Sequence, residues 1–259
     1  MAGPPSGPVH QRGTAKATGS ADRRCLVSPT VEAATLYFPA MDWLSLRRRH
    51  LGGTPDSLGG RMRQDRARWF VEIFPDLAQM SVIDFGGRVS MWQRAPVRPK
   101  HLHVVNVEPS RVDIPEWAEF DVGDACALPD HIARRRYDLV FSNSVIEHVG
   151  GHERRERFAD TVHQLSDAHW VQTPYRYFPI EPHWMAPAAQ YLPVAARAQV
   201  VRRWPLSFRR GTPRETAVRV VLSVELLDRT QLRHYFPHSQ ICAEKVFGIP
   251  KSLVAYRTS

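Results

Sequence analysis

The sequence predicts an α/β protein with a mostly parallel sheet and helices on both of its faces. Short apolar stretches of strand length alternate with amphipathic stretches of helical length from about residue 55 onward, as a parallel sheet with helical crossovers requires. Residues 137–144 (YDLVFSNS) carry apolar side chains at successive positions, as expected of a strand buried on both faces. The chain ends in two apolar stretches around one turn, which predicts an antiparallel hairpin.

The first half of the pattern contains one helix and four strands. A helix is expected over about 55–76, where Met62, Phe70 and Phe74 recur among arginines and aspartates. The strands are expected at 81–86 (SVIDFG), 103–108 (HVVNVE), 118–125 (AEFDVGDA) and 137–144.

The second half continues the pattern after one interruption. A helix is expected over 153–166, followed by a strand at 169–174 (HWVQTP) that Pro174 ends. Residues 175–222 are rich in proline, aromatic residues and arginine, which indicates an insertion or lid on the substrate side. A short helix at 228–236 and strands around 239–247 and 252–258 complete the chain, with Gly248 and Pro250 in the turn.

The length of 259 residues suits a single domain, expected over 41–259. Residues 1–40 are expected to form a disordered tail, and Met41 is an alternative start. The tail has no apolar region of the kind found in a secretory signal, and the three cysteines, Cys25, Cys126 and Cys242, lack a paired spacing. We therefore expect a cytoplasmic protein, free or peripheral to the inner membrane.

Four polar or glycine-containing groups stand at the carboxyl ends of the first four predicted strands. Asp84, Gly86 and Gly87 let the backbone approach a ligand closely, although a tight turn without a ligand explains them equally well. Glu108 follows Asp84 by 24 residues and suits two ribose hydroxyls; the alternative is an exposed carboxylate beside the turn-forming Pro109.

The third and fourth groups are as ambiguous when taken alone. Asp124 suits an exocyclic adenine amine, with Ala125 supplying backbone groups, or it caps the next helix. Ser142 and Asn143 face the crevice at the end of their strand, or they are ordinary loop residues. Because ligands bind outside the carboxyl ends of parallel strands, the order of all four groups favours a nucleotide-type site.

The runs DFGGRVSMW, VVNVEPS, VGDACALP and YDLVFSNSVIEHV together resemble the motifs of class I S-adenosylmethionine (SAM)-dependent methyltransferases. The resemblance is closest to a bacterial branch with a Gly-Gly turn followed by Trp. TPYRYFPIEPHW and EKVFGIPKSLVAYR also resemble that branch, so the similarity covers about residues 55–259. It implies SAM as cofactor and a Rossmann-like sheet of order 3-2-1-4-5-7-6 with strand seven antiparallel.

The resemblance also implies a role for each group. It assigns the methionine and ribose part of SAM to Asp84, Gly86 and Gly87, the ribose hydroxyls to Glu108, the adenine to Asp124 and Ala125, and the methionine end to Ser142 and Asn143.

Methyl transfer requires an aligned acceptor and often a base. Glu181 and His183, in the segment after the fifth strand, are candidates to orient or deprotonate a hydroxyl, and His148 is a second candidate base. The alternatives are a rigid proline-rich loop in which Glu181 bonds backbone amides, and a loop histidine at 148. No metal site is expected, because glycines separate His148 from His152.

The segment 195–219 contains seven arginines and a single acidic residue, Glu215, in a chain of net charge +9. Such a segment suits phosphate groups or an anionic bilayer, or it is simply a solvated basic face. We expect a small-molecule or glycan acceptor, phosphate- or lipid-linked, methylated at oxygen.

Three other functions remain open. An RNA methyltransferase fits the charge but lacks an appended RNA module. A non-catalytic scaffold would explain Arg88 and Ser90, which stand where the commoner motif has glycines, but not Asp84 and Glu108. A nicotinamide dehydrogenase fits least, because the phosphate-binding glycines are incomplete.

Overall fold

The computed structural model describes residues 57–258. The expected tail 1–40, Met41 and Cys25 lie outside this range. The helices are α2 (Leu58–Ile73), η2 (Leu77–Gln79), α3 (Val89–Trp92), α4 (Asp130–Ala133), α5 (His152–Leu165), η3 (Ala189–Tyr191), α6 (Val194–Arg203), α7 (Arg214–Leu222) and α8 (Arg229–Tyr235). The strands are β1 (Ser81–Phe85), β2 (His101–Asn106), β3 (Ala118–Val122), β4 (Leu139–Asn143), β5 (His169–Pro174), β6 (Ile180–Glu181), β7 (Ala186–Pro187), β8 (Gln240–Val246) and β9 (Ile249–Arg257).

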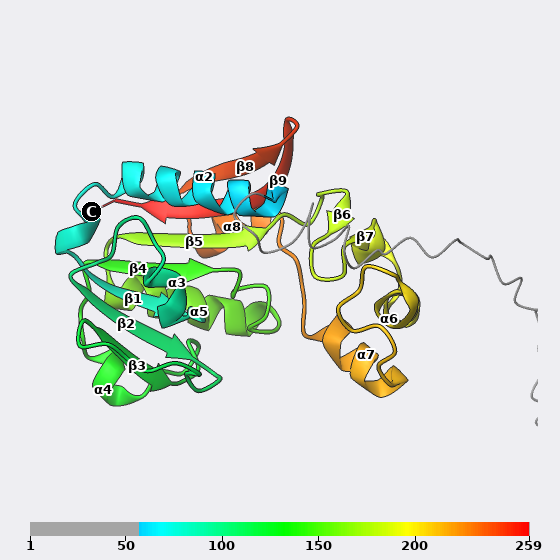
Figure 1. Cartoon of the computed structure of the whole chain (residues 1–259), viewed down its shortest axis with the longest axis horizontal. Helices are drawn as coiled ribbons and strands as arrows, with labels where there is room; N and C mark the ends of the chain where they lie inside the picture. Colours follow the sequence, from blue (N-terminus) through cyan, green and yellow to red (C-terminus); the bar gives the residue numbers. More distant parts are fainter. Residues whose placement is uncertain (1–56, 259) are drawn as a thin grey trace, which may run out of the picture. The chain divides into compact units, whose positions relative to one another are not determined.

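Seven strands form one sheet in the order β3-β2-β1-β4-β5-β9-β8 (Figure 1). The strands β1 to β5 pair in parallel, whereas β9 is antiparallel to both β5 and β8. Since β9 is the seventh strand of this sheet along the chain and β8 the sixth, the predicted order 3-2-1-4-5-7-6 is confirmed. The strand order reverses between β1 and β4, and in such sheets the crevice outside the carboxyl ends at that point is where ligands bind.

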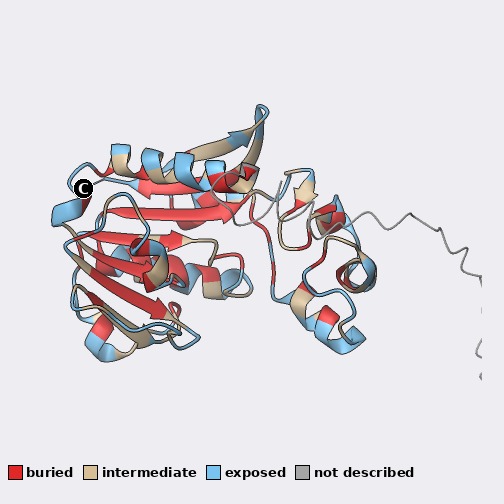
Figure 2. Cartoon of the chain, viewed as in Figure 1, coloured by how far each residue is buried: buried red, intermediate tan, exposed pale blue. Residues whose placement is uncertain are grey.

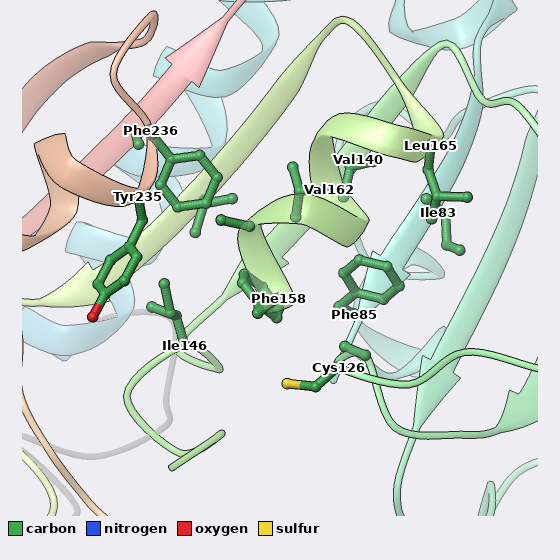
Figure 3. Close-up of a cluster of buried hydrophobic side chains, with 14 of the residues drawn as sticks. Ile83, Phe85, Cys126, Val140, Ile146, Phe158, Val162, Leu165, Tyr235 and Phe236 are labelled. Carbon is green, nitrogen blue, oxygen red and sulfur yellow. The ribbon is translucent and has the colours of Figure 1, made fainter. Parts of the chain in front are cut away.

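Helices cover both faces of the sheet, as predicted. On one face Phe70 of α2 and Phe74, directly after it, pack with Trp170 and other strand residues. On the other face Phe158 of α5 and Phe236, directly after α8, pack in a second cluster with the strands (Figure 3). Figure 2 shows the result: the central strands are buried, and the helices expose only their outer sides.

Local hydrogen bonds explain where two of these helices begin. The hydroxyl of Ser57 accepts a hydrogen bond from the Gly60 N–H at 3.0 Å and so caps α2. Asp228 and Gln231 form a reciprocal capping box at the start of α8. Both caps satisfy backbone donors that have no partner within their own helix.

Two details differ from the sequence prediction, which also did not locate the helix after β1. That helix is a single turn, because α3 ends at Trp92. The strand β3 ends at Val122, so Asp124 lies in a loop rather than in the predicted strand 118–125. The hairpin turn is formed by Phe247 and Gly248, whose φ angles of 48° and 80° suit a tight two-residue turn, and Pro250 lies within β9.

The predicted insertion 175–222 has secondary structure of its own. It contains the β6–β7 hairpin, η3, α6 and α7. Buried residues of this segment, including Trp184, Val201 and Val221, form an apolar cluster to which the sheet contributes no residue. Within residues 57–258, no helix has the length and apolar character needed to cross a membrane.

Candidate functional site

The turn after β1 requires glycine at both of its central positions. Gly86 has a φ of +72°, and a Cβ there would lie 2.4 Å from Cγ2 of Val145. A Cβ on Gly87 would lie 1.7 Å from a carboxylate oxygen of Asp84. The side-chain amide of Asn106 donates to the carbonyls of Gly86 and Gly87, both at 3.0 Å. The side chains of Asp84, Val145 and Asn106 therefore hold this turn in place, against the end of β2 and the loop after β4.

Asp84 is buried beneath the glycine turn. Its Oδ2 accepts a hydrogen bond from the indole N–H of Trp92 at 2.7 Å, and its Oδ1 has no partner among residues 57–258. Burial raises the pKa of Asp84 to about 7, although the hydrogen bond from Trp92 opposes the shift. A buried polar atom without a partner is unusual, so Oδ1 is a candidate acceptor for a ligand.

A cleft of about 200 Å³ adjoins the turn. It is lined by Gly87–Ser90, Asn106, Glu108–Val112 and Phe120. Glu108 is largely exposed here, its N–H donates to Oδ1 of Asn106 at 3.1 Å, and its carboxylate lies 3.5 Å from Arg111. The structure thus places Glu108 and Gly87, two of the predicted cofactor residues, in one cleft.

The carboxylate of Asp124 already has protein partners. Its Oδ1 accepts from the N–H of Cys126 at 2.9 Å, and its Oδ2 pairs with Arg154 at 2.6 Å. Ala125 beside it is buried. The backbone bond resembles the capping alternative, but it closes a loop turn, since α4 begins only at Asp130.

The predicted residues of β4 lie beside β1. Ser142 aligns with Phe85 in the sheet, is fully buried, and has a hydroxyl without a hydrogen-bond partner in the described part of the chain. Asn143 accepts a hydrogen bond from Arg66 of α2 at 2.7 Å. Two unpartnered polar atoms, Oδ1 of Asp84 and Oγ of Ser142, therefore belong to neighbouring strands near their carboxyl ends.

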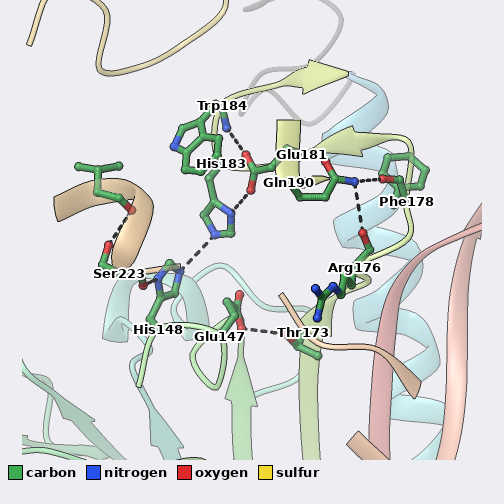
Figure 4. Close-up of polar contacts among 11 residues, drawn as sticks. Glu147, His148, Thr173, Arg176, Phe178, Glu181, His183, Trp184, Gln190 and Ser223 are labelled. Atoms are coloured by element: carbon green, nitrogen blue, oxygen red, sulfur yellow. Dashed lines mark hydrogen bonds and ion pairs between the residues drawn. The ribbon is translucent and has the colours of Figure 1, made fainter. Parts of the chain in front are cut away.

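The second part of the site is a chain of three side chains (Figure 4). His183 Nδ1 lies 2.7 Å from Oε1 of Glu181, and His183 Nε2 lies 3.2 Å from Nε2 of His148. Glu181 is buried, and its second oxygen accepts from the N–H of Trp184 at 2.8 Å. The backbone bond that the alternative interpretation expected for Glu181 is thus present together with the histidine contact.

The two histidines differ in their preferred protonation. Burial works to lower the pKa of His183, but the hydrogen bond and charge of Glu181 outweigh it and raise that pKa. Burial and the neighbouring His183 lower the pKa of His148, whose Nδ1 donates to the carbonyl of Ser223 at 3.1 Å. Of the two rings, His183 therefore holds a proton more tightly than His148 does.

Glu147 completes this group, although the sequence analysis did not select it. It is buried, one oxygen accepts from the hydroxyl of Thr173 at 3.0 Å, and the other has no partner within the described range. Burial raises the pKa of Glu147 to about 7. The signal in the sequence was its position directly before His148, in the loop that follows β4.

The loop after β4 connects the two parts of the site. Ser144 begins it with a φ of 60°, and the side chain of Val145 lies against Gly86. Glu147 and His148 follow within three residues, and the backbone carbonyl of Glu147 accepts from the N–H of Glu225 at 2.9 Å. One short loop thus contacts the glycine turn and supplies two members of the histidine group.

The chain was compared with known proteins by sequence and by structure, and only the structure comparison finds similar proteins. No family model and no curated protein matches the chain. The N-methyltransferase NodS from Bradyrhizobium japonicum WM9 is 14% identical, with a TM-score of 0.39, over 76% of this chain and 97% of that one. The magnesium protoporphyrin IX methyltransferase ChlM from Synechocystis PCC 6803, solved with bound SAH, is 12% identical, with a TM-score of 0.44, over 77% and 85%. The N-terminal domain of EvdMO1, in the presence of SAH and D-fucose, is 15% identical, with a TM-score of 0.42, over 76% and 82%. At these identities and scores, none of them assigns an activity to this chain.

The pKa of Asp84 leads to a stability prediction. Its folded value of about 7 exceeds the ordinary value of 3.8, so the folded chain binds the proton more tightly than the unfolded chain does. The resulting stabilisation is present in full below about pH 4 and is lost as the pH rises through 7. Asp84→Asn keeps an acceptor for Trp92 and has no charge to titrate. Between pH 5 and pH 8 we expect the wild type to lose about 2.5 kcal/mol of unfolding free energy relative to this variant.

Urea unfolding of both proteins at the two pH values measures this difference. Glu147 titrates in the same range but is present in both proteins, so its contribution cancels. A difference that does not change with pH would mean that Asp84 is ionised throughout.

Proposed function

We propose that this chain is a SAM-dependent methyltransferase acting on a small-molecule or glycan acceptor, at oxygen. The observation that carries the proposal is the glycine turn at the reversal between β1 and β4. A buried Asp84 excludes any side chain from Gly87, and an exposed Glu108 lies in the adjoining cleft. This arrangement allows close backbone approach and offers a carboxylate suited to ribose hydroxyls, at the edge where ligands of such sheets bind.

The residues present fit SAM. Glu108 would hold the ribose hydroxyls, and the backbone at Gly86 and Gly87 would contact the ribose and methionine part. The unpartnered atoms of Asp84 and Ser142 would accept from, or donate to, the polar groups of the methionine end. Bound SAM supplies an electrophilic methyl group on its sulfonium. Asp124 and Ala125 would flank the adenine, with Asp124 also bound to Arg154.

Removing the carboxylate of Glu108 should weaken cofactor binding without unfolding the protein, because this side chain is largely exposed. Hydrogen bonds to a charged group contribute about 1.5–3 kcal/mol, so we expect Glu108→Ala to weaken SAM and S-adenosylhomocysteine binding about 10- to 100-fold. Isothermal titration calorimetry measures both affinities. Glu116→Ala, at another exposed glutamate, is the matched control and should bind as the wild type does. No binding to the folded wild type would favour the scaffold hypothesis instead.

We infer that Glu181, His183 and His148 position or deprotonate the acceptor hydroxyl. The support is geometric: Glu181 fixes the ring of His183, as carboxylates do for catalytic histidines, and the carbonyl of Ser223 fixes His148. Trp184 is buried beside this group and holds Glu181 through its backbone.

Replacing His183 should affect turnover and not cofactor affinity. We expect His183→Ala to reduce kcat about 10²- to 10⁴-fold, the usual contribution of a positioned acid or base, with SAM affinity within twofold of the wild type. Steady-state kinetics on an acceptor found by screening, together with calorimetry, separates the two effects. His238→Ala, at an exposed histidine outside the site, is the control. Equal kcat values for His183→Ala and His238→Ala would mean that His183 does not contribute to catalysis.

The arginine-rich segment supports an anionic acceptor. Of its seven arginines, five are exposed, namely Arg203, Arg209, Arg210, Arg214 and Arg219. Phe208 in this segment is 73% exposed, and Leu222, three residues beyond it, is 63% exposed. Arginine beside exposed apolar side chains suits a phosphorylated lipid carrier at a membrane surface.

Vesicle binding tests this assignment. Each basic residue near an anionic surface contributes about 1 kcal/mol, so Arg209→Gln with Arg210→Gln should weaken binding to phosphatidylglycerol vesicles about 10- to 30-fold. The double variant Arg134→Gln with Arg136→Gln changes the net charge equally at exposed sites outside the segment and should bind normally. Equal losses in both variants would mean attraction by net charge alone. Salt-sensitive retention of RNA instead of vesicles would favour the RNA methyltransferase.

A further inference from the structure

His148 and His183 point their Nε2 atoms at each other across 3.2 Å, while both Nδ1 atoms are already occupied. His148 Nδ1 lies 3.1 Å from the backbone carbonyl of Ser223, and His183 Nδ1 lies 2.7 Å from the carboxylate of Glu181. Carbonyl and carboxylate oxygens only accept, so each Nδ1 carries a hydrogen. When both rings are neutral, the lone pairs of the two Nε2 atoms therefore face each other and repel. A proton or a metal cation between the two atoms would remove this repulsion.

Glu147 supplies a third potential ligand at the same place. One ligand atom of each of Glu147, His148 and His183 lies within 4.8 Å of those of the other two. Glu147 is 1% exposed, and its Oε1 has no hydrogen-bond partner in the described structure. Figure 4 shows its other oxygen bonded to Thr173, which leaves Oε1 free to turn toward the histidine pair.

We propose that Glu147, His148 and His183 bind a divalent transition-metal ion, and that Zn²⁺ fits them best. Two imidazole nitrogens and one carboxylate oxygen are the protein ligands of many catalytic zinc sites, which leave the fourth position open. With Zn–N bonds of about 2.0–2.1 Å, two ligands of a tetrahedron lie about 3.3 Å apart. The two Nε2 atoms already have this separation.

The surroundings of the two histidines support the metal over a simple hydrogen bond. Metal-binding histidines commonly donate their second N–H to a carboxylate or a backbone carbonyl, which fixes the ring and the tautomer. Glu181 and Ser223 do this for His183 and His148 respectively. Glu181 is itself held by the N–H of Trp184, so the support extends into the apolar cluster of the insertion.

The described residues contain one other group of this kind, formed by His152, Glu156 and His234. All three side chains are exposed, and Glu156 already pairs with both histidines at 3.2 and 3.6 Å. No buried carboxylate oxygen without a partner belongs to this group. It therefore serves as an internal control for weak surface binding.

The open coordination position gives the metal a role in the proposed reaction. An acceptor hydroxyl bound there would be fixed in place and made more acidic, as oxygen ligands of zinc are. With zinc bound, both nitrogens of each ring are engaged, so His148 and His183 would position the hydroxyl through the metal and would not take up its proton. This role alone rests on the proposed function, because metal binding depends only on the three side chains.

Calorimetric titration of the chelator-treated full chain with ZnCl₂ tests the site. We expect one site of micromolar or tighter affinity in the wild type, weakened at least 100-fold in His183→Ala and in Glu147→Gln. The glutamine in Glu147→Gln keeps an acceptor for Thr173, so we expect this variant to fold. It tests the site even if His183→Ala does not fold. The variant His152→Ala with His234→Ala should keep the wild-type affinity. Co²⁺ in place of Zn²⁺ should give the visible absorption of a four-coordinate nitrogen and oxygen site in the wild type and in this control only.

Wild-type affinity in both His183→Ala and Glu147→Gln, or loss of binding in the His152 and His234 variant alone, would overturn the proposal. SAM titration of the same samples separates it from the proposed function. Zinc binding without SAM binding upholds the metal site and contradicts the methyltransferase. SAM binding without zinc binding contradicts the metal site and leaves the methyltransferase proposal standing.

Discussion

The carboxylate of Asp84 occupies the space that a side chain on Gly87 would need, and the rest of the site is arranged around this contact. On its other side Gly86 lies against Val145, so the turn is held between β1 and the loop after β4. Asn106 ties the same turn to the end of β2 through two hydrogen bonds. The ends of β1 and β2 and the loop after β4, which carries Glu147 and His148, thereby meet at this one turn.

Burial disfavours the ionised forms of Asp84 and Glu147 and raises the pKa of both carboxyl groups to about 7. Each has one oxygen hydrogen-bonded and one without a partner in the described chain. Buried groups of this kind are rare where only folding matters and are concentrated at binding and catalytic sites. Their presence at the carboxyl ends of β1 and β4 is the main reason to regard this edge as functional and not merely as a connection.

The fold could be predicted from the sequence to a large extent, because alternation of strand and helix patterns reports burial directly. The seven strands and the long helices α2 and α5 follow from it, whereas the strand order was implied only by the resemblance to class I methyltransferases. Turn geometry did not follow: Phe247 takes a positive φ that nothing in its residue type favours, and Pro250 fits within the last strand.

The site was predicted in part. The sequence could predict the residues that follow strands, namely Asp84, the glycines and Glu108, because a residue just after a parallel strand lies at the carboxyl edge of the sheet. The structure brings Glu108 and Gly87 to one cleft. Glu181 and His183 are two residues apart, so their contact is local. Their contact with His148, and the inclusion of Glu147, depend on how residues 175–222 pack against the loop after β4. Contacts between residues 35 positions apart produce no periodic pattern in the sequence. The grouping of Glu147, His148 and His183 could therefore not be predicted from the sequence.

The apolar cluster of residues 175–222 has a consequence for how such a protein diversifies. Because Trp184, Val201 and Val221 pack with one another and not with the sheet, substitutions on the outer surface of α6 and α7 should leave the glycine turn undisturbed. The outer surface of this segment can therefore change, or the whole segment between Pro174 and Val224 can be exchanged by grafting, while the strands and the glycine turn stay the same. The contacts that join the segment to the rest of the described chain would have to be inherited with it, namely those of His183 and Ser223 with His148 and the backbone bonds of Tyr175 and Arg176.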